Sequence, residues 1–309
     1  MTLAIEARQP RYAVNLALLV LLATLWGASY TFIKIGVATI PPFTLIAGRT
    51  LIAGAILLAI MGLRGIAMPR EPAVWGRFMI QACLNSVIPF TTIAWAEHHV
   101  DAALATILNS NAPIFTFLLS VLFVRHERPT LRQALGVMAG LVGICLIVGV
   151  NALQGLGTQL AAQIALVAAA VCAGAAALFG RNFSGLDPIV PAAGSMICGA
   201  LLLLPFSVVV ERPWTLSPSR ESIYALLGLA VFSTALAFSI YFRLLQTLGS
   251  VGTTAQSYLR VPIGVALGAF FLGETLSPTA WAGLVCVIVG IAAMTIPVRA
   301  RSVPTPQGQ

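Results

Sequence analysis

Long apolar runs alternate with short polar segments along almost the whole of this 309-residue chain. A helix needs about 20 predominantly apolar residues to cross the hydrocarbon core of a bilayer. Runs of that length predict ten transmembrane helices, over residues 13–35, 43–62, 76–96, 102–124, 131–150, 159–181, 188–210, 222–242, 250–272 and 279–298. The connections between them are short, so no soluble domain of useful size is left over. The pattern predicts an all-α integral membrane protein.

Composition supports this interpretation. Apolar residues make up 59% of the chain and charged residues only 8%, whereas a soluble domain carries about 25% charged residues. A net charge of +8 would suggest nucleic-acid binding in a soluble protein. Here the basic residues lie in short loops between apolar runs, where membrane orientation places them. We therefore expect membrane lipid around the chain and no nucleic-acid partner.

The basic residues of the loops also predict an orientation, because cytoplasmic loops are enriched in Lys and Arg. With the N-terminus inside, only three basic loop residues fall on the outer side, namely Lys34, Arg212 and Arg220. Twelve fall on the inner side: Arg8, Arg11, Arg64, Arg70, Arg77, Arg125, Arg128, Arg132, Arg181, Arg243, Arg299 and Arg301. Both termini are therefore predicted to be cytoplasmic.

The chain also contains an internal repeat. A shift of 147 residues places matching Pro, Glu and Gly residues on one another in order, at the same edges of the predicted elements. The pairs are Pro41 with Pro188, Glu127 with Glu274, Gly136 with Gly283 and Gly143 with Gly290; Pro113 and Pro262 match after a two-residue slip. The predicted units are a cytoplasmic segment 1–12, a five-helix repeat 13–150, a second repeat 159–298 and a cytoplasmic tail 299–309.

Each repeat holds an odd number of spans, so the second repeat must enter the membrane from the opposite side. Inverted repeats with a substrate site at their interface are typical of secondary transporters. We expect two inverted five-helix repeats around a central cavity.

Three features of the chain form a recognisable set: the run Trp26 to Lys34, Arg49, and the segment from Pro113 to Gly143 with its echo from Pro262 to Gly290. In these features the sequence resembles the drug/metabolite transporter superfamily, in its EamA-type ten-helix branch. The resemblance covers roughly residues 10–300 and implies a multi-pass protein of the bacterial inner (plasma) membrane that moves small metabolites, often exporting amino acids or drugs. The first repeat departs from the pattern, because no Gly precedes Glu127 as Gly273 precedes Glu274.

Polar residues recur at helical spacing inside five of the predicted spans. Because a polar group facing lipid goes unsatisfied, such stripes are expected to face the protein interior or water. Hydrogen bonds between helices explain single Ser or Thr residues, but they explain the amides less well. We predict that the following residues line a substrate path: Trp26, Tyr30, Arg49, Asn85, Trp95, Asn109, Asn111, Tyr241, Gln256, Tyr258 and Arg260.

The two arginines within spans are the most informative of these residues. Arg260 lies about ten residues into its span, where a guanidinium is costly and needs a partner. No Asp or Glu occurs deep in any span, so Arg260 is either a substrate-carboxylate ligand or a strut held by carbonyls and polar side chains. Arg49 lies nearer a span end and can alternatively extend to the interface.

Two further features concern movement and aromatic contacts. Pro113 and Pro262 occupy matching spans, and the kinks that proline introduces could act as hinges or as static bends. The aromatic residues near the polar stripes could stack on an apolar or ring-bearing substrate, or some could belong to the interfacial aromatic belt, as fits Trp95 in part.

These observations favour a secondary transporter of small metabolites, most often amino acids or related amphipathic compounds, working by alternating access. Broad drug efflux through the same cavity is the alternative. The acidic and histidine residues of 97–101 match no zinc-helix spacing, so we expect neither metal nor other cofactor. The three histidines lie at span ends, which argues against an enzyme. The sequence leaves the substrate, the coupling ion and the oligomeric state open, a monomer included.

Overall fold

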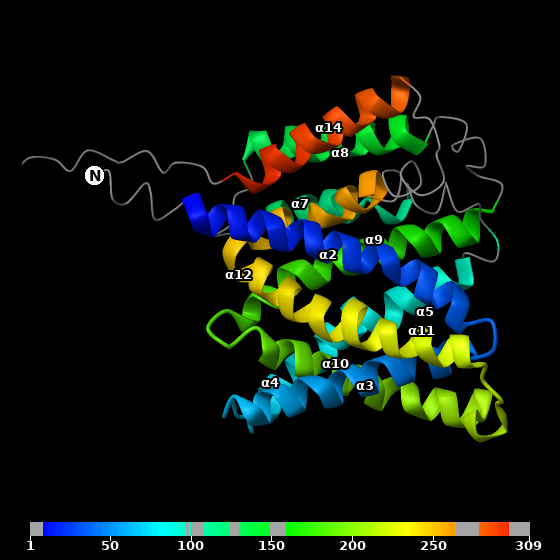
Figure 1. The fold of residues 1–309 in the computed structure, drawn as a ribbon. Coiled ribbons are helices and arrows are strands. Elements are labelled where there is room, and N and C mark those ends of the chain that lie inside the picture. The colour runs from blue at the N-terminus through cyan, green and yellow to red at the C-terminus, as the bar shows by residue number, and fades with distance from the viewer. Residues whose placement is uncertain are drawn as a thin grey trace, which may run out of the picture.

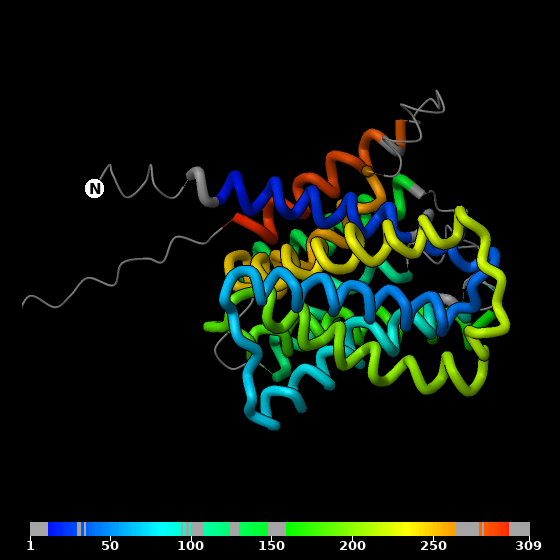
Figure 2. Tube along the Cα trace, turned by 60° about the horizontal axis from the view of Figure 1, so that its bottom comes forward, coloured from blue at the N-terminus to red at the C-terminus, as the bar shows by residue number. Residues whose placement is uncertain are grey.

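A computed structural model of the chain describes residues 9–96, 99, 108–123, 130–148, 159–263 and 278–296. The side chains of residues 9–11, 30, 31, 34, 94, 148 and 280 lie outside this description. Every regular element among the described residues is helical, which confirms the all-α prediction. The helices share one general direction and form a single bundle (Figures 1 and 2).

The first half contains three long helical stretches and two shorter ones. Helix α2 spans Gln9–Gly36 and α3 spans Pro42–Leu63. Helices α4 (Pro72–Ala82) and α5 (Ile88–Ala96) are joined by the π-helical turn η1 (Cys83–Val87), so the third span is continuous from residue 72 to 96. Helix α7 spans Ala112–Phe123 and α8 spans Leu131–Val148.

The second half repeats this order. Helix α9 (Leu160–Phe179) runs into the 3₁₀ turn η3 (Gly180–Phe183), and α10 (Ile189–Phe206) ends in the π turn η4 (Ser207–Glu211). After the short η5 (Pro213–Thr215), α11 (Arg220–Ala230) continues through the π turn η6 (Val231–Leu236) into α12 (Ala237–Thr254). Helix α14 spans Pro278–Thr295.

Five of these stretches are long and apolar enough to cross a membrane, with three shorter apolar helices beside them. The predicted spans agree with the helices to within a few residues wherever the chain is described. One connection differs. Residues 243–249 were expected to be a loop, but the helix continues to Leu248 and breaks only at Gly249, whose φ of 74° favours glycine. A single residue therefore separates the eighth and ninth spans.

The fifth spans of the two halves, α8 and α14, pack closely along their length (Figure 1). A Cβ at Gly136 would lie 2.8 Å from the carbonyl oxygen of Gly290, and one at Gly143 would lie 2.6 Å from that of Gly283. Positions that match under the 147-residue shift thus contact each other crosswise. Contacts of this kind arise when two equivalent helices run antiparallel about a two-fold axis, as the inverted repeat predicts.

The second spans, α3 and α10, also run antiparallel, and each end of the pair carries a carboxylate. Glu211, at the end of α10, accepts hydrogen bonds from the backbone N–H groups of Phe43 and Thr44, at 3.0 and 2.6 Å. At the other end Asp187 accepts from the backbone N–H of Ile189 and pairs with Arg64 at 3.2 Å. Carboxylates at helix N-termini satisfy otherwise unpaired N–H groups.

The two internal π turns lie at equivalent places in the repeat. The 147-residue shift moves η1 onto residues 230–234, and η6 spans 231–236. A π turn inside an α-helix leaves the normal hydrogen-bond ladder and is frequent at functional sites. Each turn packs against the opposite half, η1 against α9 and α10 and η6 against α2 and α3.

Candidate functional site

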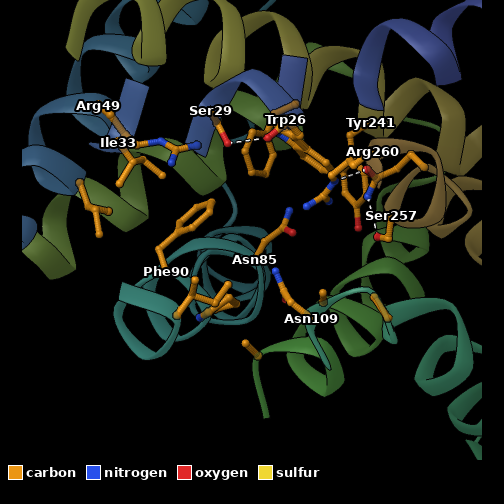
Figure 3. Close-up of a pocket in the computed structure, with 18 of the residues that line it drawn as sticks. Trp26, Ser29, Ile33, Arg49, Asn85, Phe90, Asn109, Tyr241, Ser257 and Arg260 are labelled. Carbon is orange, nitrogen blue, oxygen red and sulfur yellow. Dashed lines mark hydrogen bonds between the residues drawn. The ribbon is translucent and has the colours of Figure 1, made fainter. Parts of the chain in front are cut away.

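A cavity lies between the halves and is lined by residues of both. Figure 3 shows its polar and aromatic side chains converging from several helices. Seven of the eleven residues predicted to line a substrate path do line this cavity: Trp26, Arg49, Asn85, Asn109, Tyr241, Gln256 and Arg260.

Two of the lining amides are related by the internal repeat. Asn109 and Gln256 are separated by 147 residues, and both face the cavity although they belong to opposite halves. An axis that relates the halves must therefore pass near the cavity. A site on such an axis is where inverted-repeat transporters bind their substrates.

Arg260 is partly buried at one side of the cavity (Figure 3). Its Nε donates a hydrogen bond of 2.8 Å to Oε1 of Gln256, whose Nε2 in turn donates to Ser257 at 3.0 Å. The guanidinium carbon lies 5.2 Å from the centre of the Trp26 ring, a cation–π distance. These contacts orient the side chain, but neither of them neutralises its charge.

Arg49 lies at the other side of the cavity in the same view and is only 1% exposed. It therefore does not extend to the interface, which was the alternative that its place in the span allowed. Its Nε donates to Oγ1 of Thr234 at 2.9 Å, and its guanidinium carbon lies 4.3 Å from the centre of the Phe90 ring. Within the described part of the chain its Nη1 has no hydrogen-bond partner.

Three aromatic rings form one wall. Trp26 packs against Phe238 and Tyr241, with ring centroids 5.5 and 5.4 Å apart. The indole N–H of Trp26 donates to the carbonyl oxygen of Ser233 in η6 at 3.2 Å. This bond fixes the ring that lies under Arg260, so the π turn helps to position the wall.

The other π turn supplies a polar patch whose groups are not fully paired. Asn85 lines the cavity from η1, beside Ser86 in the same turn. Among the described residues, neither Nδ2 of Asn85 nor the buried Oγ of Ser86 has a partner. A buried donor without a partner is costly, so this patch is suited to a polar ligand or to water.

Four predicted residues lie elsewhere or are not described. Tyr258 is fully buried, packs on Gly140 of α8 and donates to the carbonyl oxygen of Val137 at 3.1 Å. Trp95 is 49% exposed and stacks on His99. Asn111 donates to the carbonyl oxygen of Leu108 and is absent from the cavity lining. The side chain of Tyr30 lies outside the described residues.

The predicted hinge prolines are both buried. Pro113 stands in the first turn of α7, directly after the break at Ser110 and Asn111, where proline fits without disturbing a helix. Pro262 lies in the helical stretch that follows the turn at Ala255. A hinge role for either proline stays a prediction. The acidic and histidine residues of 97–101 lie, except for His99, outside the described residues.

Sequence reasoning missed two lining aromatics. Phe238 precedes Tyr241 by three residues, so the helical spacing already placed the two on one face. Phe90 follows Pro89 directly and belongs to no polar stripe, and only the packing of α5 against α3 brings it over Arg49. No local signal in the sequence could have found it.

Comparison with known proteins gives the class. The chain matches the EamA-like transporter family twice, over residues 14–149 and again over 160–296. It belongs to this family, a branch of the drug/metabolite transporter superfamily, as the resemblance indicated. It is accordingly a multi-pass membrane transporter protein.

Individual relatives are similar along most of their length. The chain is 26% identical to the uncharacterized inner membrane transporter YedA of Escherichia coli K12 over 273 residues, which cover 88% of this chain and 87% of YedA. It is 24% identical to the uncharacterized transporter YoaV of Bacillus subtilis, covering 90% and 96% of the two chains. It is 26% identical to the protein PagO of Salmonella typhimurium, covering 93% and 96%.

A solved crystal structure shares the fold. Its TM-score with this chain is 0.75 at 20% sequence identity, and the match covers 91% of this chain and 97% of the other. At that identity the likeness concerns the fold alone.

Proposed function

We propose that this protein is a secondary transporter that exports small carboxylate-bearing metabolites, with amino acids and related amphipathic compounds as the favoured class. The observation that carries the proposal is Arg260, a partly buried cation that faces the cavity between the halves. Broad-specificity drug efflux is the alternative that the experiment below must separate.

The charge of the cavity supports an anionic group on the substrate. Two arginines line the cavity, and no Asp or Glu is among the described residues that line it. A carboxylate is the natural partner for a guanidinium, because the two form paired, charge-assisted hydrogen bonds. An organic cation would meet two like charges in a poorly solvated space, which disfavours cationic drugs.

The remainder of the lining supports an amphipathic substrate. Trp26, Phe238 and Tyr241 offer an apolar wall beside Arg260, while Asn85 and Asn109 offer amides from the first half. A carboxylate on Arg260 would leave the substrate's side chain against the aromatic wall. This combination of a few placed polar groups in an apolar cavity is typical of small-molecule sites.

Alternating access is the expected mechanism. The halves are joined by antiparallel pairs of equivalent helices, so a rocking motion that closes one side can open the other. The cavity lies between the elements that would move.

The test is uptake into proteoliposomes by purified protein, with a panel of amino acids, simple carboxylates and cationic dyes. We expect carboxylate-bearing compounds to be transported and Arg260→Met to reduce their uptake by about 10- to 100-fold, since bonds to charged groups contribute roughly 1.5–3 kcal/mol. Arg243→Met is the matched control, because Arg243 is exposed on α12. Unchanged uptake by Arg260→Met, or a preference for cationic dyes, would contradict the proposal.

A further inference from the structure

The cavity is lined by a second arginine, Arg49, whose contacts resemble those of Arg260. Both Arg49 and Arg260 use Nε to donate to a neutral oxygen of the protein, that of Thr234 at 2.9 Å and that of Gln256 at 2.8 Å. Both guanidinium groups lie against an aromatic ring, at 4.3 and 5.2 Å from the ring centres. In Arg260 only the inner nitrogen is engaged in this way, whereas in Arg49 Nη2 also donates to the carbonyl oxygen of Ser233, at 3.5 Å, and Nη1 is left without a partner among the described residues.

Neither arginine forms an ion pair with a described residue. The only ion pair in the described part of the chain is Arg64 with Asp187, at the exposed end of α3. Arg49 is 1% exposed and its Nη1 has no partner among the described residues. A buried guanidinium with an unpaired donor is expensive, so a functional reason for its retention is required.

The repeat argues against a purely structural role for Arg49. The equivalent position in the second half is Met196, which is fully buried. An unbranched apolar side chain therefore fills this position of the fold when no charge is present. The arginine is a departure from the repeat, confined to the half in which the residue also lines the cavity.

We propose that Arg49 forms a second anion subsite, so that the cavity takes an organic dianion with carboxylates at both ends. This inference rests on the proposed function, in which Arg260 binds the first carboxylate. The two arginines enter the cavity from opposite sides in Figure 3, with Trp26 and Ser29 between them. Dicarboxylates, including amino acids with an acidic side chain, match two separated cations better than monocarboxylates do.

Phe90 explains how Arg49 can be both a ligand and buried. The ring lines the cavity and covers the guanidinium, a contact that compensates part of the charge while the subsite is empty. A carboxylate gains charge-assisted hydrogen bonds by moving the ring aside. Phe90 is thus the cover of the subsite.

The experiment measures competition against a transported labelled carboxylate in proteoliposomes. The competitors are the straight-chain dicarboxylates from malonate to adipate and the monocarboxylates of matched length. A series of chain lengths identifies the distance between carboxylates that matches the distance between the two arginines. For the wild type we expect the best dicarboxylate to compete about tenfold more strongly than its matched monocarboxylate. Arg49→Met, which copies Met196, should remove that preference, and Arg49→Lys should keep part of it.

The control is Arg64→Met, the same substitution at the residue that directly follows α3. Its side chain is 54% exposed and it is not among the residues that line the cavity, so this variant should keep the preference. Equal competition by dicarboxylates and monocarboxylates in the wild type overturns this inference and leaves the proposed function standing. Failure of every carboxylate overturns both. If the Arg49 variants do not fold, the wild-type comparison of dicarboxylates with monocarboxylates still tests the subsite. If Arg49→Met folds and keeps the preference for dicarboxylates, the subsite is also overturned.

Discussion

The two halves of this transporter match at one region and diverge at another. Along the α8–α14 seam, Gly143 and its repeat partner Gly290 make the same backbone contact, with a Cβ at either position lying 2.6 Å from a glycine carbonyl oxygen. At the two π turns the halves differ. Ser233 and Thr234 of η6 are fully engaged with α2 and α3, whereas Ser86 of η1 has no partner among the described residues.

This comparison distinguishes the residues that the duplicated fold needs in both halves from the residues that serve the cavity in one half only. At the α8–α14 seam two backbones are in direct contact, which requires glycine at the contact positions. Because equivalent positions of the two halves make the same contact there, both halves must keep the glycine. Both π turns interrupt the α-helical hydrogen-bond ladder at equivalent places, but the residues in the two turns make different contacts. In η6 the carbonyl oxygen of Ser233 accepts hydrogen bonds from Trp26 and Arg49, whereas in η1 the side chain of Asn85 faces the cavity.

The largest effect is expected at the seam. Gly143→Ala and Gly290→Ala should each lower the free energy of unfolding by about 2–3 kcal/mol, and by similar amounts, because the added Cβ in both cases meets backbone that cannot move aside. Denaturant titration of the detergent-solubilised protein measures this change. Gly76→Ala is the control, since nothing lies within 4 Å of a Cβ there. Strongly unequal losses would contradict the symmetry of the seam.

A smaller effect on stability is expected at the position where η6 has a threonine and η1 has a valine. Thr234 corresponds to Val87 in the first half, and its hydroxyl accepts from Arg49 and donates to Leu229. Thr234→Val should cost about 2 kcal/mol, because it takes a partner from a buried guanidinium. The reverse change, Val87→Thr, should alter stability little. The same unfolding titration compares the two, and equal effects would mean that Arg49 does not depend on η6.

The smallest effect, with opposite signs in the two halves, is expected at the paired serines. The Ser233 hydroxyl donates to the carbonyl oxygen of Leu25 at 2.8 Å, so Ser233→Ala should cost about 0.6 kcal/mol, a typical value for a hydrogen bond between membrane helices. Ser86→Ala removes a buried hydroxyl that has no partner among the described residues, and it should be neutral or slightly stabilising. Thermal unfolding midpoints suffice to order the two variants; destabilisation by Ser86→Ala would show that its hydroxyl is paired.

Much of the fold could be predicted from local pattern. The positions of the spans follow from the thickness of the hydrocarbon core, and the repeat follows from residues such as Gly136 and Gly283 that recur in register. Hydropathy placed the break inside a connection of seven residues, 243–249, because Arg243, Gln246 and Thr247 interrupt the apolar run although they belong to the helix that ends before Gly249. Seven of the predicted cavity residues line the cavity because polar side chains in a membrane span avoid lipid.

The sequence by itself determined that this chain is a duplicated membrane protein with two arginines inside its spans, since length, hydropathy and repetition are properties of the chain alone. Only the tertiary structure decided that Arg49 turns inward against Thr234, that Phe90 covers it, and that Tyr258 packs against α8 in the core instead of lining the cavity. The direction in which a side chain points around its helix depends on the neighbouring helices, and those neighbours are far away in sequence.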